Sequence, residues 1–451
     1  MKTLICGGAV CLDAGFVNCD VLLSEGKIER IGENLTFDSN VIRVDATGLW
    51  VIPGLIDFHV HMDDRIGGVP LADTYHSGSM AAVLSGITTL IGFVTQSPER
   101  SLSTCIAEAE QKVNYRSFCD AAFHLTPTHF ADSDWDEIGR LVKAGYRTFK
   151  FYTTYREAGL YQDYDSLRRI LTRLSALGAR VLIHAEDQNR LDEIAASLSL
   201  LPEAYSHAWL RLPEIERIAI ERVIQFGRET GAAVHIVHVS TPEGAERIGN
   251  ARTDFEITCE TAPHYLLFTE EQLRGADGHR YLCTPPLRSP ESRAALTKQA
   301  ASGVFDIFAT DHAAFSREDK DRYRASFGKV PSGLAGVGAL FPLLYKMLVL
   351  KHNVPMHELV QRLSANPAKL AGLFPRKGTI RVGADADLLL LNPNGSPRPV
   401  RSSLADCYEP YVNHTTTLDF RYVFLRGEVV VKDNRITKPD RPTGRHIRAV
   451  E

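Results

Sequence analysis

Two histidines stand two positions apart in the stretch "GLIDFHVHMDD", residues 54–64, directly after an apolar run. Side chains on a β-strand alternate between its two faces, so His59 and His61 can point to the same side. Two imidazoles at one strand end can bind a single metal ion. A polar strand end that only meets solvent would show the same pattern, so residues elsewhere in the chain have to decide between the two interpretations.

More candidate ligands lie at the ends of other strand-like runs. Lys150 lies in "TFKFYTTY", His184 in "LIHAED", His238 in "IVHVS" and Asp311 in "ATDHAAF". Imidazole and carboxylate groups are ligands that suit zinc or a similar divalent ion. Each residue alone could be structural, but four histidines and one aspartate at the ends of separate strands predict a shared metal site.

The lysine does not fit an ordinary cation site, because the ammonium of Lys150 would repel a metal ion and is costly to bury. If CO₂ carboxylates the amine, the product is an anionic carbamate whose two oxygens can bridge two metals. The alternative is a lysine that buries its methylene chain and extends its amine to solvent. The spacing of the residues leaves both interpretations open.

The elements that must position these residues follow a regular pattern between residues 50 and 312. Short β-branched or aromatic runs alternate with longer amphipathic stretches of helical period. Eight runs are strand-like: "VIPGLIDF", "ITTLIGFV", "SFCDAAFHL", "YRTFKFY", "RVLIH", "AVHIVHV", "FEITCE" and "FDIFAT". This pattern predicts an α/β fold, a (β/α)₈ barrel with its catalytic residues at the carboxyl ends of the strands. An open doubly wound sheet is the alternative, but the glycine-rich dinucleotide turn is missing after the first strand.

Both ends of the chain have a different character. The stretches "VLLSEGKIERIG", "ADADLLLLNP" and "FRYVFLRGEVVVKDNRI" indicate short strands and hairpins. We therefore expect a small β-sandwich domain built from residues 1–49 plus 376–451. The barrel, as a hydrolase domain, would occupy residues 50–375.

The composition excludes several classes of protein. A net charge of -4 gives no basic surface for nucleic acid, and 44% apolar with 24% charged residues argues against disorder. No apolar run approaches the roughly 18 residues of a membrane span, so we expect no membrane partner. The eight cysteines lack a Cys-x-x-Cys spacing, which favours reduced thiols and a cytoplasmic protein. A small-molecule enzyme fits these properties.

Several motifs in order along the chain carry a resemblance: "GLIDFHVHMD", "FKFYTTY", "HAED", "IVHVSTPEGAERI", "CETAPHYL", "PPLR" and "ATDHAAFS". With them, the sequence resembles the cyclic amidohydrolases of the hydantoinase and dihydropyrimidinase type over nearly its whole length. The resemblance implies two Zn²⁺ ions per subunit, although other divalent ions would also suit the ligands. It places His59, His61 and Asp311 on one metal, His184 and His238 on the other, and N6-carboxylated Lys150 between them.

The resemblance also implies roles for residues that contact the substrate. Tyr155 matches the tyrosine that polarises the substrate carbonyl, and Asp311 would act as the catalytic base. Thr284 and Ser332 match positions whose backbone groups hold the cyclic amide. Arg65 departs from the pattern, because hydantoinases usually carry proline in this loop. We expect Arg65 either to bind an anionic or ureido substituent of the substrate or to be a solvated loop charge.

We therefore predict a metal-dependent hydrolase that opens the cyclic amide of a hydantoin or dihydropyrimidine. An allantoinase is the first alternative, with the same metal ligands. A dihydroorotase is less favoured, because Asp63 stands where those enzymes carry an arginine. A non-enzymatic relative of dihydropyrimidinase, a structural or interaction protein, is opposed by the complete set of ligand positions. We also expect a homo-oligomer, a tetramer or a dimer.

Three further histidines lie close to the predicted ligands in sequence. His235 lies three residues before His238, which predicts that it faces away from the site and packs against a helix. His312 is expected to support the neighbouring Asp311. His264, in "TAPHYL", is expected either to touch the substrate or to support the site.

Overall fold

A parallel eight-stranded sheet forms the centre of the computed structural model, which describes residues 2–36, 40–197 and 203–449. All eight predicted runs contribute a strand, and the strands follow one another in the sheet in the same order as in the chain, from β6 to β15. They are β6 (Leu55–Asp57), β9 (Ile87–Thr95), β10 (Asp120–Thr126), β11 (Thr148–Tyr152), β12 (Arg180–His184), β13 (Val234–Ile236), β14 (Ile257–Thr261) and β15 (Ile307–Phe308). A parallel bridge between Val60 and His312 connects the two ends of the sheet. The predicted barrel is confirmed.

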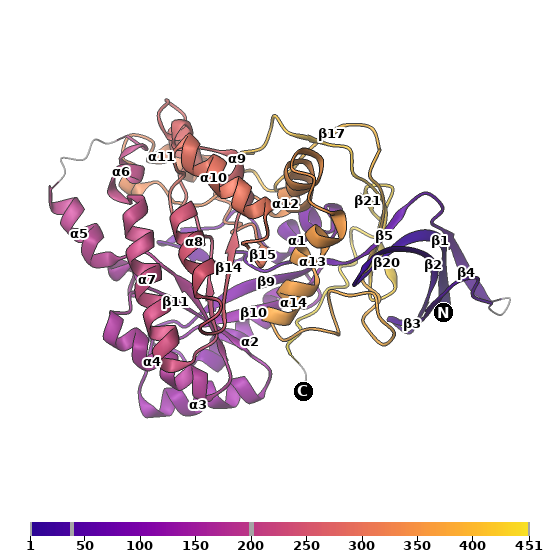
Figure 1. The fold of residues 1–451 in the computed structure, drawn as a ribbon, viewed down its shortest axis with the longest axis horizontal. Helices are drawn as coiled ribbons and strands as arrows, with labels where there is room; N and C mark the ends of the chain where they lie inside the picture. Colours follow the sequence, from indigo (N-terminus) through magenta and orange to yellow (C-terminus); the bar gives the residue numbers. More distant parts are fainter. Residues whose placement is uncertain (1, 37–39, 198–202, 450–451) are drawn as a thin grey trace.

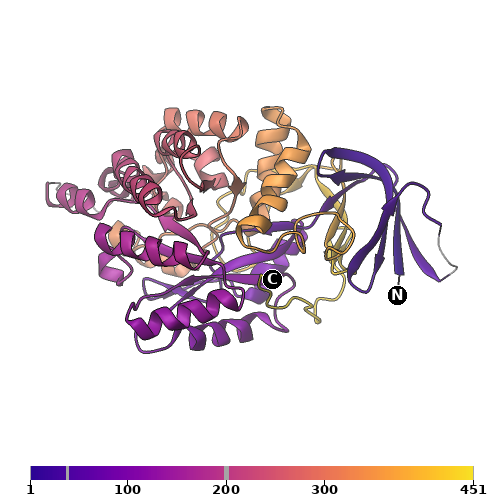
Figure 2. The same ribbon diagram turned by 60° about the horizontal axis from the view of Figure 1, so that its bottom comes forward.

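Helices cover the outside of this sheet, as Figures 1 and 2 show from two directions. N-cap side chains stabilise the starts of several helices: Ser101 and Asp163 each accept a hydrogen bond from the backbone N–H three residues later. The main helices are α1 (Tyr75–Leu84), α2 (Leu102–Val113), α3 (Asp132–Lys143), α4 (Tyr164–Ala176), α5 (Gln188–Ser197), α7 (Pro213–Thr230), α8 (Pro242–Ala251), α10 (Pro290–Ala301) and α13 (Met356–Leu363). None of the helices in the described ranges is both long and apolar enough to cross a bilayer.

Two apolar cores hold these layers together. The larger one joins the strands to the surrounding helices. A second cluster includes Ile91, Leu182 and Ile307 from three barrel strands and Phe58 directly after β6, and all four side chains are at most 1% exposed. Such a packed interior makes the barrel a rigid support rather than a pore. Polar residues at the strand ends are therefore held on fixed backbone.

The two ends of the chain form one nine-stranded sheet, which confirms the β-sandwich made from both termini (Figure 1). Its strands are β1 (Lys2–Leu12), β2 (Gly15–Ser24), β3 (Lys27–Gly32), β4 (Val41–Asp45), β5 (Trp50–Pro53), β16 (Leu388–Asn392), β19 (Asp419–Leu425), β20 (Glu428–Lys432) and β21 (Arg435–Ile436). The amino-terminal and carboxy-terminal strands meet where β5 pairs with β1 on one side and β16 on the other. Apolar side chains of these strands, such as Val10, Val51 and Leu390, form their own core.

The first predicted run, "VIPGLIDF", divides between the two sheets. Its first half lies in β5 of the terminal sheet and its second half in β6 of the barrel. The chain passes from one sheet to the other at Gly54. A larger residue does not fit there, because its Cβ would lie 2.2 Å from the Thr88 hydroxyl. The last described residues also return to the barrel, where the backbone N–H of Ile447 donates to Ala121 at 2.8 Å. The division into residues 1–49 plus 376–451 and residues 50–375 otherwise stays a prediction.

Candidate metal centre

The carboxyl ends of β6 and β15 bring together the first group of predicted ligands. His59 Nε2 lies 3.1 Å from an oxygen of Asp311, and His61 Nε2 lies 3.4 Å from the same oxygen. One ligand atom from each of the three residues lies within 4.8 Å of the other two. This spacing suits a single divalent cation. The two histidines and the aspartate predicted for one metal are thus neighbours in space.

A buried carboxylate fixes the backbone on which these ligands stand. Asp57 accepts hydrogen bonds from the Thr310 N–H at 3.0 Å and the Thr310 hydroxyl at 2.5 Å, which connects the first and last barrel strands. Asp311, directly after Thr310, has a φ of 50°, a backbone conformation that is uncommon for residues other than glycine. Burial opposes ionisation of Asp311, but the neighbouring His59 and the hydrogen bond from His61 outweigh it and lower its pKa to about 2. The carboxylate is therefore ionised at neutral pH.

Glu260, on β14, orients two histidines from inside the barrel. Its carboxylate lies 2.5 Å from His59 Nδ1 and 3.2 Å from His235 Nε2. A carboxylate that accepts the proton of one ring nitrogen leaves the other nitrogen of His59 free to bind a metal. The prediction that His235 packs against a helix is wrong. Regular strand β13 ends at Ile236 and His238 has a φ of 37°, so strand alternation does not extend from His235 to His238.

His184 and His238 lie beside this group. Their ring centroids are 4.5 Å apart, and the ring of His238 lies 5.5 Å from that of His59. His184 Nε2 donates to Glu186 at 2.6 Å, which leaves its Nδ1 available. In the part of the chain that the structure describes, His238 Nδ1 is buried without a hydrogen-bond partner. A buried imidazole nitrogen without a partner is costly, and a metal ion would satisfy it.

Lys150 lies between these histidines and is only 1% exposed. Its amine packs 5.4 Å from the centre of the Phe93 ring and 5.1 Å from that of Tyr152. Burial lowers the pKa of Lys150 to about 7, although Glu260 and Asp311 oppose the shift. The amine is thus far from bulk solvent, and the interpretation as a lysine that extends to solvent is wrong. With a pKa of about 7, a substantial share of the amine is neutral at neutral pH, which is the form that reacts with CO₂.

Three of the four residues predicted to contact the substrate, Tyr155, Thr284 and Ser332, come together next to His184. The ring of Tyr155 lies 5.0 Å from that of His184, and the Thr284 side chain lies near its hydroxyl. Burial raises the pKa of the Tyr155 phenol, so the hydroxyl keeps its proton. The N–H of Gly333 donates to the Leu282 carbonyl at 2.8 Å, which places Ser332 beside the segment that carries Thr284. These three positions form one wall of the candidate site.

Arg65 is the predicted site residue that the structure does not bring to this group. It lies in a short exposed hairpin of β7 (Arg65–Ile66) and β8 (Val69–Pro70). Its Nε donates to the Gly68 carbonyl at 3.1 Å, within the same hairpin. The proposed contact of Arg65 with a substituent of the substrate stays a prediction.

The other two histidines behave differently from each other. His312 supports the loop, since its Nδ1 accepts the Gly336 N–H at 3.0 Å and its Nε2 lies 3.1 Å from Asp73. His264 is 1% exposed, and neither of its ring nitrogens has a hydrogen-bond partner among the described residues. The role of His264, in the substrate site or beside it, stays open.

The sequence analysis missed the carboxylates that orient the ligands. Glu186 and Glu260 are both at most 1% exposed, and each contacts a predicted histidine ligand. The available signal was an acid next to a strand end, in "HAED" and "CETAP". An acid at such a position has many other uses, so the signal alone does not identify it.

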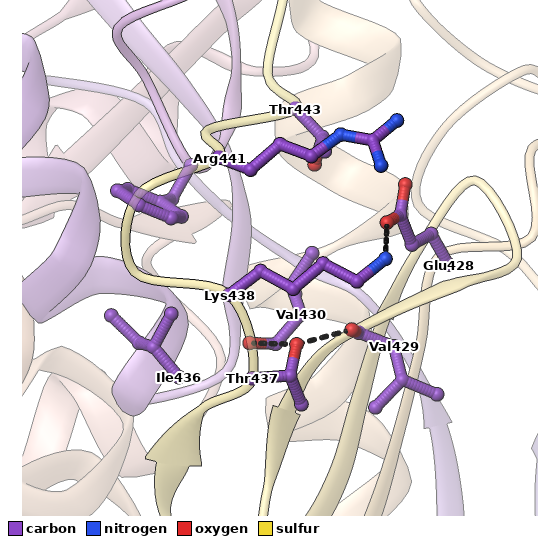
Figure 3. Close-up of a pocket in the computed structure, with 9 residues that line it drawn as sticks. Glu428, Val429, Val430, Ile436, Thr437, Lys438, Arg441 and Thr443 are labelled. Atoms are coloured by element: carbon purple, nitrogen blue, oxygen red, sulfur yellow. Dashed lines mark hydrogen bonds and ion pairs between the residues drawn. The ribbon is translucent and has the colours of Figure 1, made fainter.

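A separate shallow pocket lies on the terminal sheet, away from these residues (Figure 3). Its walls come from β20, β21 and the segment that follows. Lys438 and Glu428 form an ion pair across it at 2.7 Å. Its lining holds one carboxylate, the paired Glu428, and no histidine, so this pocket lacks the metal-ligand set of the barrel mouth.

Comparison with known proteins agrees with the geometry. The D-hydantoinase of Geobacillus stearothermophilus is 31% identical over 452 residues, which cover 97% of this chain and 95% of that enzyme. A D-phenylhydantoinase of Escherichia coli is also 31% identical, over 454 residues and 97% of this chain. The crystal structure of a dihydropyrimidinase from Brevibacillus agri superposes with a TM-score of 0.93 at 30% identity, covering 100% of this chain and 99% of that one. Residues 50–430 match the amidohydrolase family, and the chain therefore belongs to that family.

Proposed function

We propose that the protein is a metal-dependent hydrolase that opens a cyclic amide, the ring of a hydantoin or a dihydropyrimidine. The observation that carries the proposal is the convergence of His59, His61 and Asp311, whose ligand atoms lie within 4.8 Å of one another. The relatives named D-hydantoinase and dihydropyrimidinase, which align with almost the whole chain, support the choice of a cyclic amide.

The donor set fits two divalent ions, and we propose Zn²⁺. His59, His61 and Asp311 would hold one ion, and His184 and His238 the other. Two observations support the second position: the buried, unpartnered Nδ1 of His238 and the buried amine of Lys150. We infer that Lys150 is carboxylated and bridges the two ions. When bound, such ions act as Lewis acids and lower the pKa of water from about 15.7 to about 7.

Asp311 is the proposed catalytic base. Its carboxylate is ionised at neutral pH, because His59 and His61 favour the charged form over the opposing effect of burial. It would accept a proton from the attacking water and deliver it to the ring nitrogen that leaves. Its carboxylate oxygen lies 3.1 Å from His59 Nε2 and 3.4 Å from His61 Nε2, which supports a role for Asp311 beside the proposed metal.

Tyr155 is the proposed group that polarises the amide. Burial keeps its hydroxyl protonated, so the hydroxyl can donate a hydrogen bond to the substrate carbonyl oxygen. Such a donor, placed where negative charge develops, contributes roughly 3–4 kcal/mol in other enzymes. We propose that the backbone groups of Thr284 and Ser332 orient the ring from the same wall.

We further propose that the enzyme works in the cytoplasm as a homotetramer or homodimer. All eight cysteines are free thiols, as is typical of a reducing compartment. Light scattering of the purified protein would give the number of subunits.

The function is tested by metal analysis and a panel of substrates. Purified protein should contain about two zinc ions per subunit and hydrolyse hydantoin or dihydrouracil faster than allantoin or dihydroorotate. Removal of the metal with a chelator should abolish the activity, and added Zn²⁺ should restore it. Protein with full zinc content and no activity on the panel would contradict the proposal.

The same panel applied to Arg65→Leu tests whether Arg65 selects substrates by their substituent. Such a role requires a larger loss of activity with substrates that carry an acidic or ureido group than with the others.

A further inference from the structure

Two buried charged residues, Glu186 and Arg211, connect the two halves of the candidate site. Glu186 follows β12 two residues after His184, and Arg211 follows the short helix α6 (Ser206–Leu210). One oxygen of Glu186 lies 2.6 Å from His184 Nε2 and 2.6 Å from Arg211 Nη1. Glu186 is 0% exposed and Arg211 is 9% exposed. A histidine ligand and an arginine therefore share one carboxylate oxygen.

Arg211 also contacts the proposed substrate tyrosine. Its guanidinium carbon lies 5.6 Å from the centre of the Tyr155 ring, within the range of a cation–π contact. The ring of Tyr155 lies 5.0 Å from that of His184, and the Thr284 side chain lies near its hydroxyl. Tyr155 stands in the left-handed region with a φ of 66°, so neighbouring side chains must hold it in place. Arg211 is one of them.

The backbone around Arg211 is fixed from both directions. Its N–H donates to the His207 carbonyl at 3.2 Å, and its carbonyl accepts a hydrogen bond from Arg288. His207 Nε2 in turn lies 3.0 Å from the Cys283 carbonyl and 3.1 Å from the Thr284 hydroxyl. The contacts therefore run from the metal ligand His184 to the segment that would hold the substrate.

The ion pair of Glu186 and Arg211 leaves two polar atoms unused. Within the described residues, Glu186 Oε1 and Arg211 Nε are both buried without a hydrogen-bond partner. A buried ion pair with unused donors and acceptors gives little net stability, and well-packed apolar residues of similar size often replace one without loss. Its contacts instead point to a role in the site.

We propose that Glu186 and Arg211 are positioning residues that divide two tasks: Glu186 orients His184 for metal binding, and Arg211 holds the phenol of Tyr155 against the substrate carbonyl. The inference rests on the proposed function: its metal arm on zinc bound at His184, and its other arm on the role of Tyr155. The two tasks predict two different defects, which separates this role from a merely structural one.

The first arm measures zinc affinity by competition with a chelator and needs no substrate. Glu186→Gln should weaken zinc binding by about 10- to 100-fold, the usual cost of losing a carboxylate that orients a histidine ligand. Glu221→Gln is the matched control, because Glu221 pairs with Arg217 on the surface of α7. Unchanged zinc affinity in Glu186→Gln would overturn the metal half. This arm remains decisive even if the protein hydrolyses none of the substrates tested.

The second arm measures kcat and KM on the best cyclic amide of the panel. Arg211→Lys keeps the charge beside Glu186 but not the planar group beside Tyr155. It should retain two zinc ions and lower kcat at least tenfold with KM within threefold of wild type, whereas Arg217→Lys should match wild type.

In a Tyr155→Phe background, Arg211→Lys should have no further effect on kcat. A kcat within twofold of wild type, or equal losses in both backgrounds, would overturn the role of Arg211. Thermal unfolding of each variant identifies any that fails to fold, and Arg211→Gln then replaces Arg211→Lys in the same cycle.

Discussion

Lys150 is the residue whose surroundings differ most from those of an ordinary lysine. The side chain is 1% exposed, and its amine forms neither a hydrogen bond nor an ion pair with the described residues, only contacts with two aromatic rings. Burial disfavours the charged amine and lowers its pKa to about 7, although Glu260 and Asp311 favour the charge. The proposed carbamate would replace this cation by an anion with two oxygen ligands among four histidines. The burial of Lys150 therefore supports the proposed carbamate.

We expect Lys150→Ala to lose both metals and the activity, because the second ion would keep only two histidine ligands. Short carboxylic acids such as acetate should restore part of the activity, since they can occupy the space of the missing carbamate. Zinc content and turnover, with and without the added acid, are the measurements. Lys143→Ala, at the exposed end of α3, is the control and should retain both. Full zinc content in Lys150→Ala would contradict the bridging role.

At the scale of residues, the sequence predicted the candidate ligands better than the carboxylates that orient them. Residue type and the place of each histidine at or just after a strand end predicted His59, His61, His184 and His238 as ligands, and the structure brings these four side chains together. The orientation of His235 was not predictable, because it depends on an irregular backbone at His238, with a φ of 37°. Glu186 and Glu260 were missed because an acid near a strand end is common, and only its contacts reveal what it orients.

At the scale of elements, hydrophobic periodicity identified every barrel strand but not every boundary. The run "VIPGLIDF" is apolar apart from Asp57, and β5 and β6 are both mostly buried, so its hydrophobic pattern alone does not separate the two sheets. The break depends on close packing at Gly54, a tertiary feature. The hairpin of β7 and β8 was also not predicted. Each of its strands has two residues, too few for a period, although Gly67 and Gly68 both adopt positive φ in the turn.

The junction at Gly54 yields a prediction about stability. A Cβ at this position would lie 2.2 Å from the Thr88 hydroxyl and 2.9 Å from Asp387 Cβ, so Gly54→Ala forces the barrel and the terminal sheet apart. We expect a loss of about 1–3 kcal/mol in the free energy of unfolding. Denaturant unfolding of the metal-free protein would measure it.

Gly249→Ala is the matched control for this substitution. Gly249 lies in α8, where a new Cβ meets nothing within 4 Å. Alanine should stabilise that helix by up to about 1 kcal/mol. Equal effects of the two substitutions would show that packing at Gly54 does not limit the junction.

At the scale of the whole molecule, a buried ionic cluster connects the barrel to the terminal sheet. Lys377 donates to Asp120, at the start of β10, and to Asp387, just before β16, both at 2.6 Å. It also lies 3.0 Å from Asp385. Arg426, in the turn between β19 and β20, is paired with Asp120 from the other side. The cluster is thus an electrostatic contact between segments far apart in the sequence, which no local pattern predicts.

Lys377 controls the charge of its neighbours. Burial alone would raise the pKa of Asp120 and Asp385, but Lys377 together with neighbouring cations, Arg426 beside Asp120 and Lys27 and Arg376 beside Asp385, outweighs it and lowers both. A carboxyl group whose pKa is lower in the folded state stabilises the fold above its unfolded pKa of about 4, and that contribution is lost as the pH falls through the folded value. The wild-type protein should therefore keep this contribution at pH 5 as well as at pH 8.

Lys377→Met should remove the cation and leave buried carboxylates without a partner. We expect a loss of about 3–5 kcal/mol in the free energy of unfolding near pH 8. Without Lys377 the carboxyl groups should titrate at higher pH, so they can bind protons at pH 5 and the defect should be smaller there. The measurement is the difference in unfolding free energy between wild type and variant at the two values of pH.

Lys438→Met removes a cation from the exposed ion pair with Glu428 and should cost at most about 1 kcal/mol. A defect of the same size at pH 5 and pH 8 would mean that Lys377 holds the two sheets together by packing and not by its charge.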